Sequence, residues 1–108
     1  YGAAVDALEE STHHLLSTLA DGRHDDALAA SSPYLEMLGI VVGGWFMARS
    51  AIAARRMVDA GAGDAGFLAD KVVTARFYLN QLLPRAFGLG SAVSAAADDL
   101  YAISAERL

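Results

Sequence analysis

The most informative segment of this sequence reads Ser31-Ser32-Pro33-Tyr34-Leu35-Glu36-Met37-Leu38-Gly39-Ile40-Val41-Val42-Gly43-Gly44-Trp45. Serine caps free backbone N–H groups and proline suits the first helical turn, so Pro33 predicts the start of a helix over about 33–60. Its first half is apolar all round, which is typical of a helix inside a bundle. The uncharged run 37–48 has 12 residues. A membrane span requires roughly 20, so we expect none.

Apolar residues at three- and four-residue spacing predict further helices over about 2–19, 65–83 and 85–101. Gly22 is placed to end the first of them, and the glycine-rich run 61–66 is the clearest joint in the chain. We read residues 23–30 as a loop with a short helical piece, and we expect Pro84 to break or kink the third helix. Helices joined by short loops pack as antiparallel neighbours. The prediction is therefore an all-α, up-down four-helix bundle in which residues 1–108 form a single domain.

Three glycines stand inside the central predicted helix, at Gly39, Gly43 and Gly44. A glycine in a helix interior costs about 1 kcal/mol relative to alanine, so another interaction should compensate for each of them. The simplest one is the close approach of a backbone or a large ring to a place where a Cβ atom would collide. We therefore expect the third helix or a partner domain to cross here, and we assign these glycines, with Tyr34 and Trp45, to helix packing or an interface.

Composition narrows the classes of function. The 108 residues are 55% hydrophobic and carry a net charge of −5. Nucleic-acid binding needs clustered Lys and Arg, so we expect no nucleic-acid partner. The sequence contains no cysteine, which excludes disulfides and thiolate metal ligands. The apolar surplus suits a docking face as well as a core.

No combination of side chains in the sequence predicts a catalytic centre. Glu10 and His13 have the i, i+3 spacing of a di-iron ligand pair, but such bundles need a second pair and two more glutamates. We read Asp98 and Asp99 as the solvated side of a helix. The sequence has no G-x-S-x-G elbow, and the stretch 39–44 lacks the spacing and the ending of a phosphate-binding glycine loop. We expect no catalytic and no metal-binding residue, with an independent bundle that holds a small apolar ligand or a metal as the alternative.

The segment 32–45 resembles the signature of the acyl-CoA dehydrogenase C-terminal-like domain. The run Lys71-Val72-Val73-Thr74-Ala75-Arg76-Phe77-Tyr78, followed by Leu82-Leu83-Pro84, is similar to the family's penultimate helix. The run Ala97-Asp98-Asp99-Leu100-Tyr101-Ala102 is similar to its closing segment. The resemblance extends over about 5–108. Glu36 departs from it, because we expect a basic residue there.

The resemblance implies a helical accessory domain that follows the catalytic core of a large bacterial acyl-CoA dehydrogenase. Such flavoproteins oxidise acyl-CoA thioesters at Cα–Cβ in fatty acid metabolism and pass a hydride to FAD. Their catalytic glutamate and main flavin contacts lie in the core domains, so no catalytic residue is carried over and FAD is expected in the parent enzyme. The implied partners are the core domains of the same parent chain and further copies in a homo-oligomer. Because the chain starts at Tyr1 without a basic leader segment, we expect a fragment of a cytoplasmic protein without a signal peptide.

Overall fold

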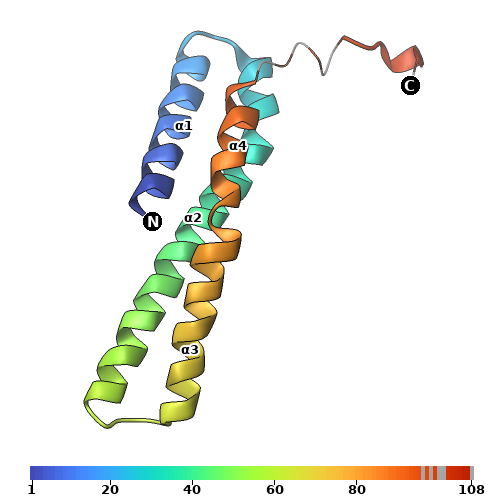
Figure 1. Cartoon of the computed structure of the whole chain (residues 1–108). Helices are drawn as coiled ribbons and strands as arrows, with labels where there is room; N and C mark the ends of the chain where they lie inside the picture. The colour runs from blue at the N-terminus through green and yellow to red at the C-terminus, as the bar shows by residue number, and fades with distance from the viewer. Residues whose placement is uncertain (96, 98, 100–101, 108) are drawn as a thin grey trace.

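The computed structural model describes residues 1–95, 97, 99 and 102–107 and is helical throughout its regular parts (Figure 1). In chain order the elements are α1 (Gly2–Ala20), α2 (His24–Asp59), α3 (Ala65–Phe77), the π-helical turn η1 (Tyr78–Leu82), α4 (Arg85–Ser94) and the 3-10 turn η2 (Ala105–Arg107). The described residues contain no strand. The all-α prediction is therefore confirmed.

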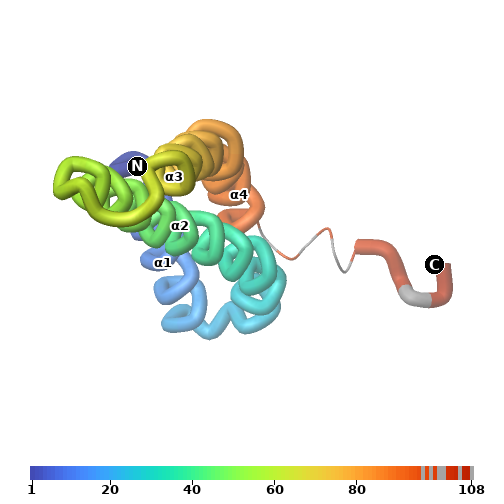
Figure 2. Tube along the Cα trace, turned by 90° about the horizontal axis from the view of Figure 1, so that it is seen from below, coloured from blue at the N-terminus to red at the C-terminus, as the bar shows by residue number. Residues whose placement is uncertain are grey.

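The helices form three rods rather than a compact bundle. α2 is the longest, α1 runs antiparallel along its first half, and α3, η1 and α4 follow one another back along α2 (Figures 1 and 2). The radius of gyration is 19.0 Å and the extents are 63 × 31 × 16 Å. A compact chain of this length has a radius of gyration of about 13 Å. The up-down four-helix bundle is thus not confirmed, because α4 continues the direction of α3 and the lower end is a two-helix hairpin.

α2 begins at His24, so the predicted loop over 23–30 and the predicted helix start at Pro33 are wrong. Pro33 lies inside the helix, where it lacks an N–H group and one backbone hydrogen bond is missing. Packing offsets this loss, since Ala27 and Ala30 on the same segment are buried. Two aspartates in the first turn also favour a helix start there, because they face the positive end of the helix dipole.

The third predicted helix is divided at Tyr78. A π-helical turn covers Tyr78–Leu82, and the Leu83 N–H donates to the Tyr78 carbonyl over 3.0 Å. In a regular α-helix the ring of Pro84 would collide with the carbonyl four residues earlier, and the wider turn carries the chain around it. α4 then begins at Arg85, as predicted. α4 ends at Ser94 and Ala95 is extended, so the predicted continuation of this helix to about residue 101 is wrong. Tyr101 and Asp98 themselves lie outside the described residues.

The joints follow the glycines. Gly22, Gly61 and Gly63 have φ values of 78°, 69° and 76°, a conformation that side chains other than glycine rarely adopt. Asp64 then caps α3, because its carboxylate accepts hydrogen bonds from two backbone N–H groups in the first turn. The predicted helix end at Gly22 and the predicted joint over 61–66 are confirmed.

The core is small and lies where α1, the first half of α2 and the start of α4 meet. It consists of Ala4, Met37, Val41, Leu83 and Ala86, all at most 5% exposed. Three of these residues approach from other elements than α2, so the core joins all three rods. The hairpin end, in contrast, leaves large apolar side chains in solvent, with Phe67 at 61% and Phe77 at 60% exposed.

Candidate functional site

Two tyrosines lie across the middle of α2 and bind its backbone. The Tyr1 hydroxyl donates to the Val41 carbonyl over 3.0 Å, and the Tyr78 hydroxyl donates to the Ile40 carbonyl over 2.7 Å. Each carbonyl has a second lone pair beyond its helical hydrogen bond, so the tyrosines bind without breaking the helix. Tyr1 precedes α1 and Tyr78 opens the π turn, so the contacts tie both outer rods to α2.

Gly43 and Gly44 leave the space that these rings occupy. A Cβ atom on Gly43 would collide with the Tyr78 hydroxyl oxygen. A Cβ atom on Gly44 would lie 3.1 Å from both the Tyr1 ring and the Leu83 side chain. The sequence pointed to a crossing at these glycines but not to the two tyrosines. A glycine inside a helix indicates that a large ring packs beside it, but the sequence does not show which residue supplies that ring.

The other three predicted interface residues lie in different surroundings. Tyr34 shares a hydrogen bond of 2.7 Å with the Thr12 hydroxyl and so joins α2 to α1. Trp45 is 43% exposed, meets Phe46 edge to face at 4.9 Å, and carries the Arg49 guanidinium 4.8 Å above its ring. Gly39 has no atom within 4 Å of an added Cβ and faces open space. The structure therefore places the five residues along one helix but not in one cluster.

Little in the described part of the chain is arranged for proton transfer or metal binding. No group of three or more His, Cys, Asp or Glu side chains there is close enough to hold a metal ion. His13 contacts Glu9 at 3.6 Å on an exposed face. Burial against α2 raises the pKa of Tyr1, and the neighbouring Tyr78 raises this pKa further. Tyr1 therefore stays neutral and serves as a hydrogen-bond donor.

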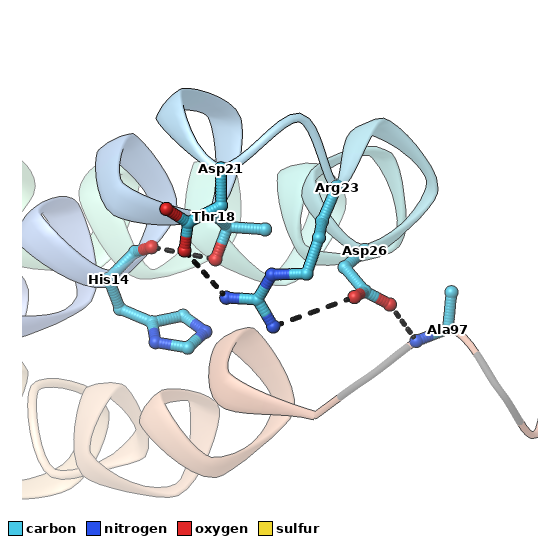
Figure 3. Close-up of polar contacts among 6 residues, drawn as sticks. All are labelled: His14, Thr18, Asp21, Arg23, Asp26 and Ala97. Carbon is cyan, nitrogen blue, oxygen red and sulfur yellow. Dashed lines mark hydrogen bonds and ion pairs between the residues drawn. The ribbon is translucent and has the colours of Figure 1, made fainter.

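A polar corner fastens the chain beyond α4 to the start of α2 (Figure 3). Arg23 lies between Asp21 and Asp26, at 3.7 and 3.8 Å from their carboxylates. The other oxygen of Asp26 accepts a hydrogen bond of 2.7 Å from the backbone N–H of Ala97, which is 3% exposed. Asp26 thus binds a segment 71 residues away in sequence.

Replacing Asp26 with alanine is expected to lower the free energy of unfolding by about 1–3 kcal/mol, because the buried Ala97 N–H loses its acceptor. Asp26→Asn keeps an acceptor and should recover part of the loss. Asp25→Ala is the matched control, since it removes a carboxylate from the same first turn and changes only a dipole interaction of about 0.3–1 kcal/mol. Urea denaturation of the three variants measures the difference. Equal losses for Asp25→Ala and Asp26→Ala would show that the contact with Ala97 contributes nothing.

The hairpin end carries an apolar groove between α2 and α3. Its volume is 330 Å³, and its lining includes Met57, Phe67, Leu68 and Lys71. The Lys71 ammonium group lies over the Phe67 ring, 5.8 Å from its centre. The groove is mostly apolar, with one cation at Lys71 and one carboxylate at Asp64.

α2 is also long and apolar enough to cross a membrane by length and composition alone. Its most apolar 18-residue window has a mean hydropathy of 1.5, and 22% of that window is buried. A core helix of a soluble protein passes the same test. In this structure the helix packs against α1, α3 and α4, which contribute Ala4, Leu68 and Ala86 among its buried neighbours.

Comparison with known proteins adds two findings. The sequence model of a family described as acetyl-CoA dehydrogenase C-terminal like matches residues 1–104. The chain is 35% identical over 91 residues to the 3-methylmercaptopropionyl-CoA dehydrogenase of Ruegeria pomeroyi. This match covers 84% of the chain but 15% of the relative, so the chain spans a small part of that protein's length. No solved structure gives a significant match.

Proposed function

Because this chain belongs to the acetyl-CoA dehydrogenase C-terminal-like family, we propose that it is the accessory domain of a larger FAD-dependent acyl-CoA dehydrogenase. Residues 1–108 act in this proposal as one docking and assembly domain without a catalytic residue of its own. The parent enzyme oxidises an acyl-CoA thioester at Cα–Cβ. The relative from Ruegeria pomeroyi acts on 3-methylmercaptopropionyl-CoA, as its name states.

The observation that carries this proposal is the amount of apolar surface that the chain leaves in solvent. Leu28, Leu35, Phe46, Phe67 and Phe77 are each at least 59% exposed. They are spread along the whole length of α2 and α3, and the molecule is thin in its shortest dimension, at 16 Å. Leu28, Leu35 and Phe46 lie on one face of α2, and an exposed apolar strip of this kind marks an interaction surface. A domain that packs against other protein surfaces accounts for it.

We assign no flavin site to the described residues of this chain. A dinucleotide requires backbone N–H groups at a helix start and a glycine-rich turn for its phosphates. The glycine-rich run 61–66 does precede α3, but it follows a helix rather than a strand, and the Asp64 carboxylate already accepts hydrogen bonds from the Gly66 and Phe67 N–H groups. A negative carboxylate at this helix start disfavours a phosphate group there. We therefore assign the FAD and the hydride transfer to other parts of the parent enzyme and derive no chemical step from this chain.

The partners in this proposal are the catalytic core domains of the same parent chain and further copies of this domain in a homo-oligomer. We propose a cytoplasmic location, without a membrane span and without a nucleic-acid partner. The hairpin of α2 and α3 carries positive side chains, but nucleic-acid binding needs a dense basic patch on a basic domain. The whole chain carries a net charge of −5.

The test is a calorimetric titration of the 108-residue chain with FAD and with octanoyl-CoA. We expect no heat beyond dilution for either, while a parent enzyme that includes its core domains binds both. Tight binding of either compound to the chain alone would overturn the accessory role. Phe67→Ala, which opens the groove beside α3, would then show whether that groove is the binding site.

A further inference from the structure

One face of α2 carries a regular row of exposed residues along most of the helix. The row alternates steps of four and three residues, and all of its members are exposed: Leu28, Ser32, Leu35, Gly39, Val42, Phe46, Arg49, Ala53 and Arg56. We call this row the α2 seam. Alternating four- and three-residue spacing is the pattern by which one helix packs along another in a coiled coil.

The α2 seam has the composition of an interface centre. Leu28 is 68%, Leu35 67% and Phe46 59% exposed. Trp45 lies beside Phe46 and supports the Arg49 guanidinium on its ring. Tryptophan, phenylalanine and arginine are enriched where protein interfaces gain most of their affinity. The residues by which α2 packs within the chain, such as Met37 and Val41, lie on another face of the helix.

Gly39 gives an independent indication that a partner covers the seam. The rings of Tyr1 and Tyr78 account for Gly44 and Gly43, but beyond the adjoining helix backbone no described atom lies within 4 Å of a Cβ on Gly39. A glycine in the middle of a helix is destabilising relative to alanine, and nothing within the described chain compensates for this one. A side chain from another molecule that packs onto Gly39 would do so.

We propose that the α2 seam pairs with the α2 seam of a second copy of this chain, antiparallel and with the two-fold axis at Val42. This inference rests on the assembly role proposed above and names its surface, partner and orientation. Val42 is the midpoint of the seam, which runs from Leu28 to Arg56. When one copy is turned end to end about Val42, the spacing of its seam is nearly unchanged. Phe46 of one copy then lies opposite Gly39 of the other, with an offset along the helix of one residue's rise, about 1.5 Å.

Charge selects the antiparallel orientation. The seam has cations in its second half, at Arg49 and Arg56, and acidic residues flank its first half, at Asp25 and Glu36. None of these four groups forms an ion pair with another described residue. Antiparallel pairing brings Arg49 next to Glu36 of the second copy and places Arg56 within one helical turn of Asp25, at an end where Asp59 also lies opposite Asp25. Parallel pairing would place each arginine against its own equivalent, which is repulsive.

Sedimentation equilibrium of the 108-residue chain tests the pairing. We expect a concentration-dependent rise from 11.3 kDa to twice that mass. Phe46→Glu is expected to raise the dissociation constant at least about tenfold, because Phe46 is at the seam centre. Phe67→Glu is the matched control, since Phe67 is equally exposed but lies on α3, and it should leave the constant unchanged. Circular dichroism confirms that both variants keep their helix content.

Disulfide cross-linking tests the orientation, because the chain has no cysteine of its own. Val42→Cys lies on the proposed axis and should form a covalent dimer under mild oxidation. Leu35→Cys should not react with itself but should cross-link to Arg49→Cys when the two variants are mixed. Parallel pairing predicts the opposite, with Leu35→Cys joining to its own equivalent, and would overturn the proposal.

A mass that stays at 11.3 kDa at all concentrations would also overturn the proposed pairing. The α2 seam would then contact the core domains of the parent enzyme instead. A dimer that Phe67→Glu disrupts and Phe46→Glu does not would place the contact elsewhere and overturn it too. The outcome is distinguishable from that of the ligand titration. Binding of FAD or octanoyl-CoA bears on the accessory role, whereas the mass and the cross-links report on the seam alone.

Discussion

Replacing Met37 with alanine is expected to lower the free energy of unfolding by about 2–5 kcal/mol. Met37 is 0% exposed and lies in the cluster that joins the three rods, together with Ala4, Leu83 and Ala86. Its buried neighbours include Ala4 and Ala86, whose short side chains cannot move in to fill the space. Because a domain of this size has about 5–15 kcal/mol of total stability, the loss removes a large part of it.

Urea denaturation, followed by circular dichroism, measures this effect. Leu16→Ala is the matched control, since Leu16 is 58% exposed on α1 and outside the seam, and it should change the free energy by no more than about 0.5 kcal/mol. Equal losses for the two variants would show that Met37 is not at the centre of the core. If the free energy of unfolding falls by less than about 1 kcal/mol, the loss is below the usual range for such cavities, and the core collapses around the alanine.

Replacing Gly43 with leucine is expected to destabilise the fold by about 1–3 kcal/mol, because the new side chain takes the place of the Tyr78 hydroxyl. The hydrogen bond from Tyr78 to Ile40 is lost at the same time. Gly39→Leu is the control in the same helix. Nothing lies within 4 Å of its added Cβ, and leucine improves helix propensity by up to about 1 kcal/mol.

Thermal unfolding of both variants, at a concentration where the chain is monomeric, separates these expectations. The midpoint should fall for Gly43→Leu and rise or stay constant for Gly39→Leu. Tyr78→Phe removes the atom nearest to the new side chain, so combining it with Gly43→Leu should recover part of the loss in a non-additive way. An unchanged midpoint in Gly43→Leu would show that the close approach of Tyr78 does not matter for stability.

Local chemistry made most helix ends predictable from the sequence. Gly22 and the joint over 61–66 were recognised because left-handed backbone requires glycine. The predicted break at Pro84 holds, although a π turn precedes it. Pro33 misled the prediction, since a Ser-Ser-Pro run marks a helix start only where packing does not continue the helix through it. The buried Ala27 and Ala30 provide that packing here, and a local pattern cannot reveal it.

The residues assigned to helix packing also divide into features that the sequence predicted and features that depend on the tertiary structure. The sequence showed that Gly39, Gly43 and Gly44 needed an explanation, because the cost of a helix glycine is a local property. Which ring meets which glycine depends on two tyrosines far away in the sequence, because Tyr78 packs on Gly43 and Tyr1 packs on Gly44. The first half of α2 is apolar on all sides, which predicted a buried helix inside a bundle. That one face of it lies in solvent was decided by the tertiary structure.

The sequence alone was sufficient for the helical class, the joints at its glycines and the family, because these depend on local propensity and on residue identity. The tertiary structure decided that α3, η1 and α4 run as one rod along α2, and that the apolar surplus lies on an open face instead of inside a bundle. These features depend on which distant surfaces bury one another. That choice is set by the sum of many small packing contacts across the rods, and no segment of the sequence contains it.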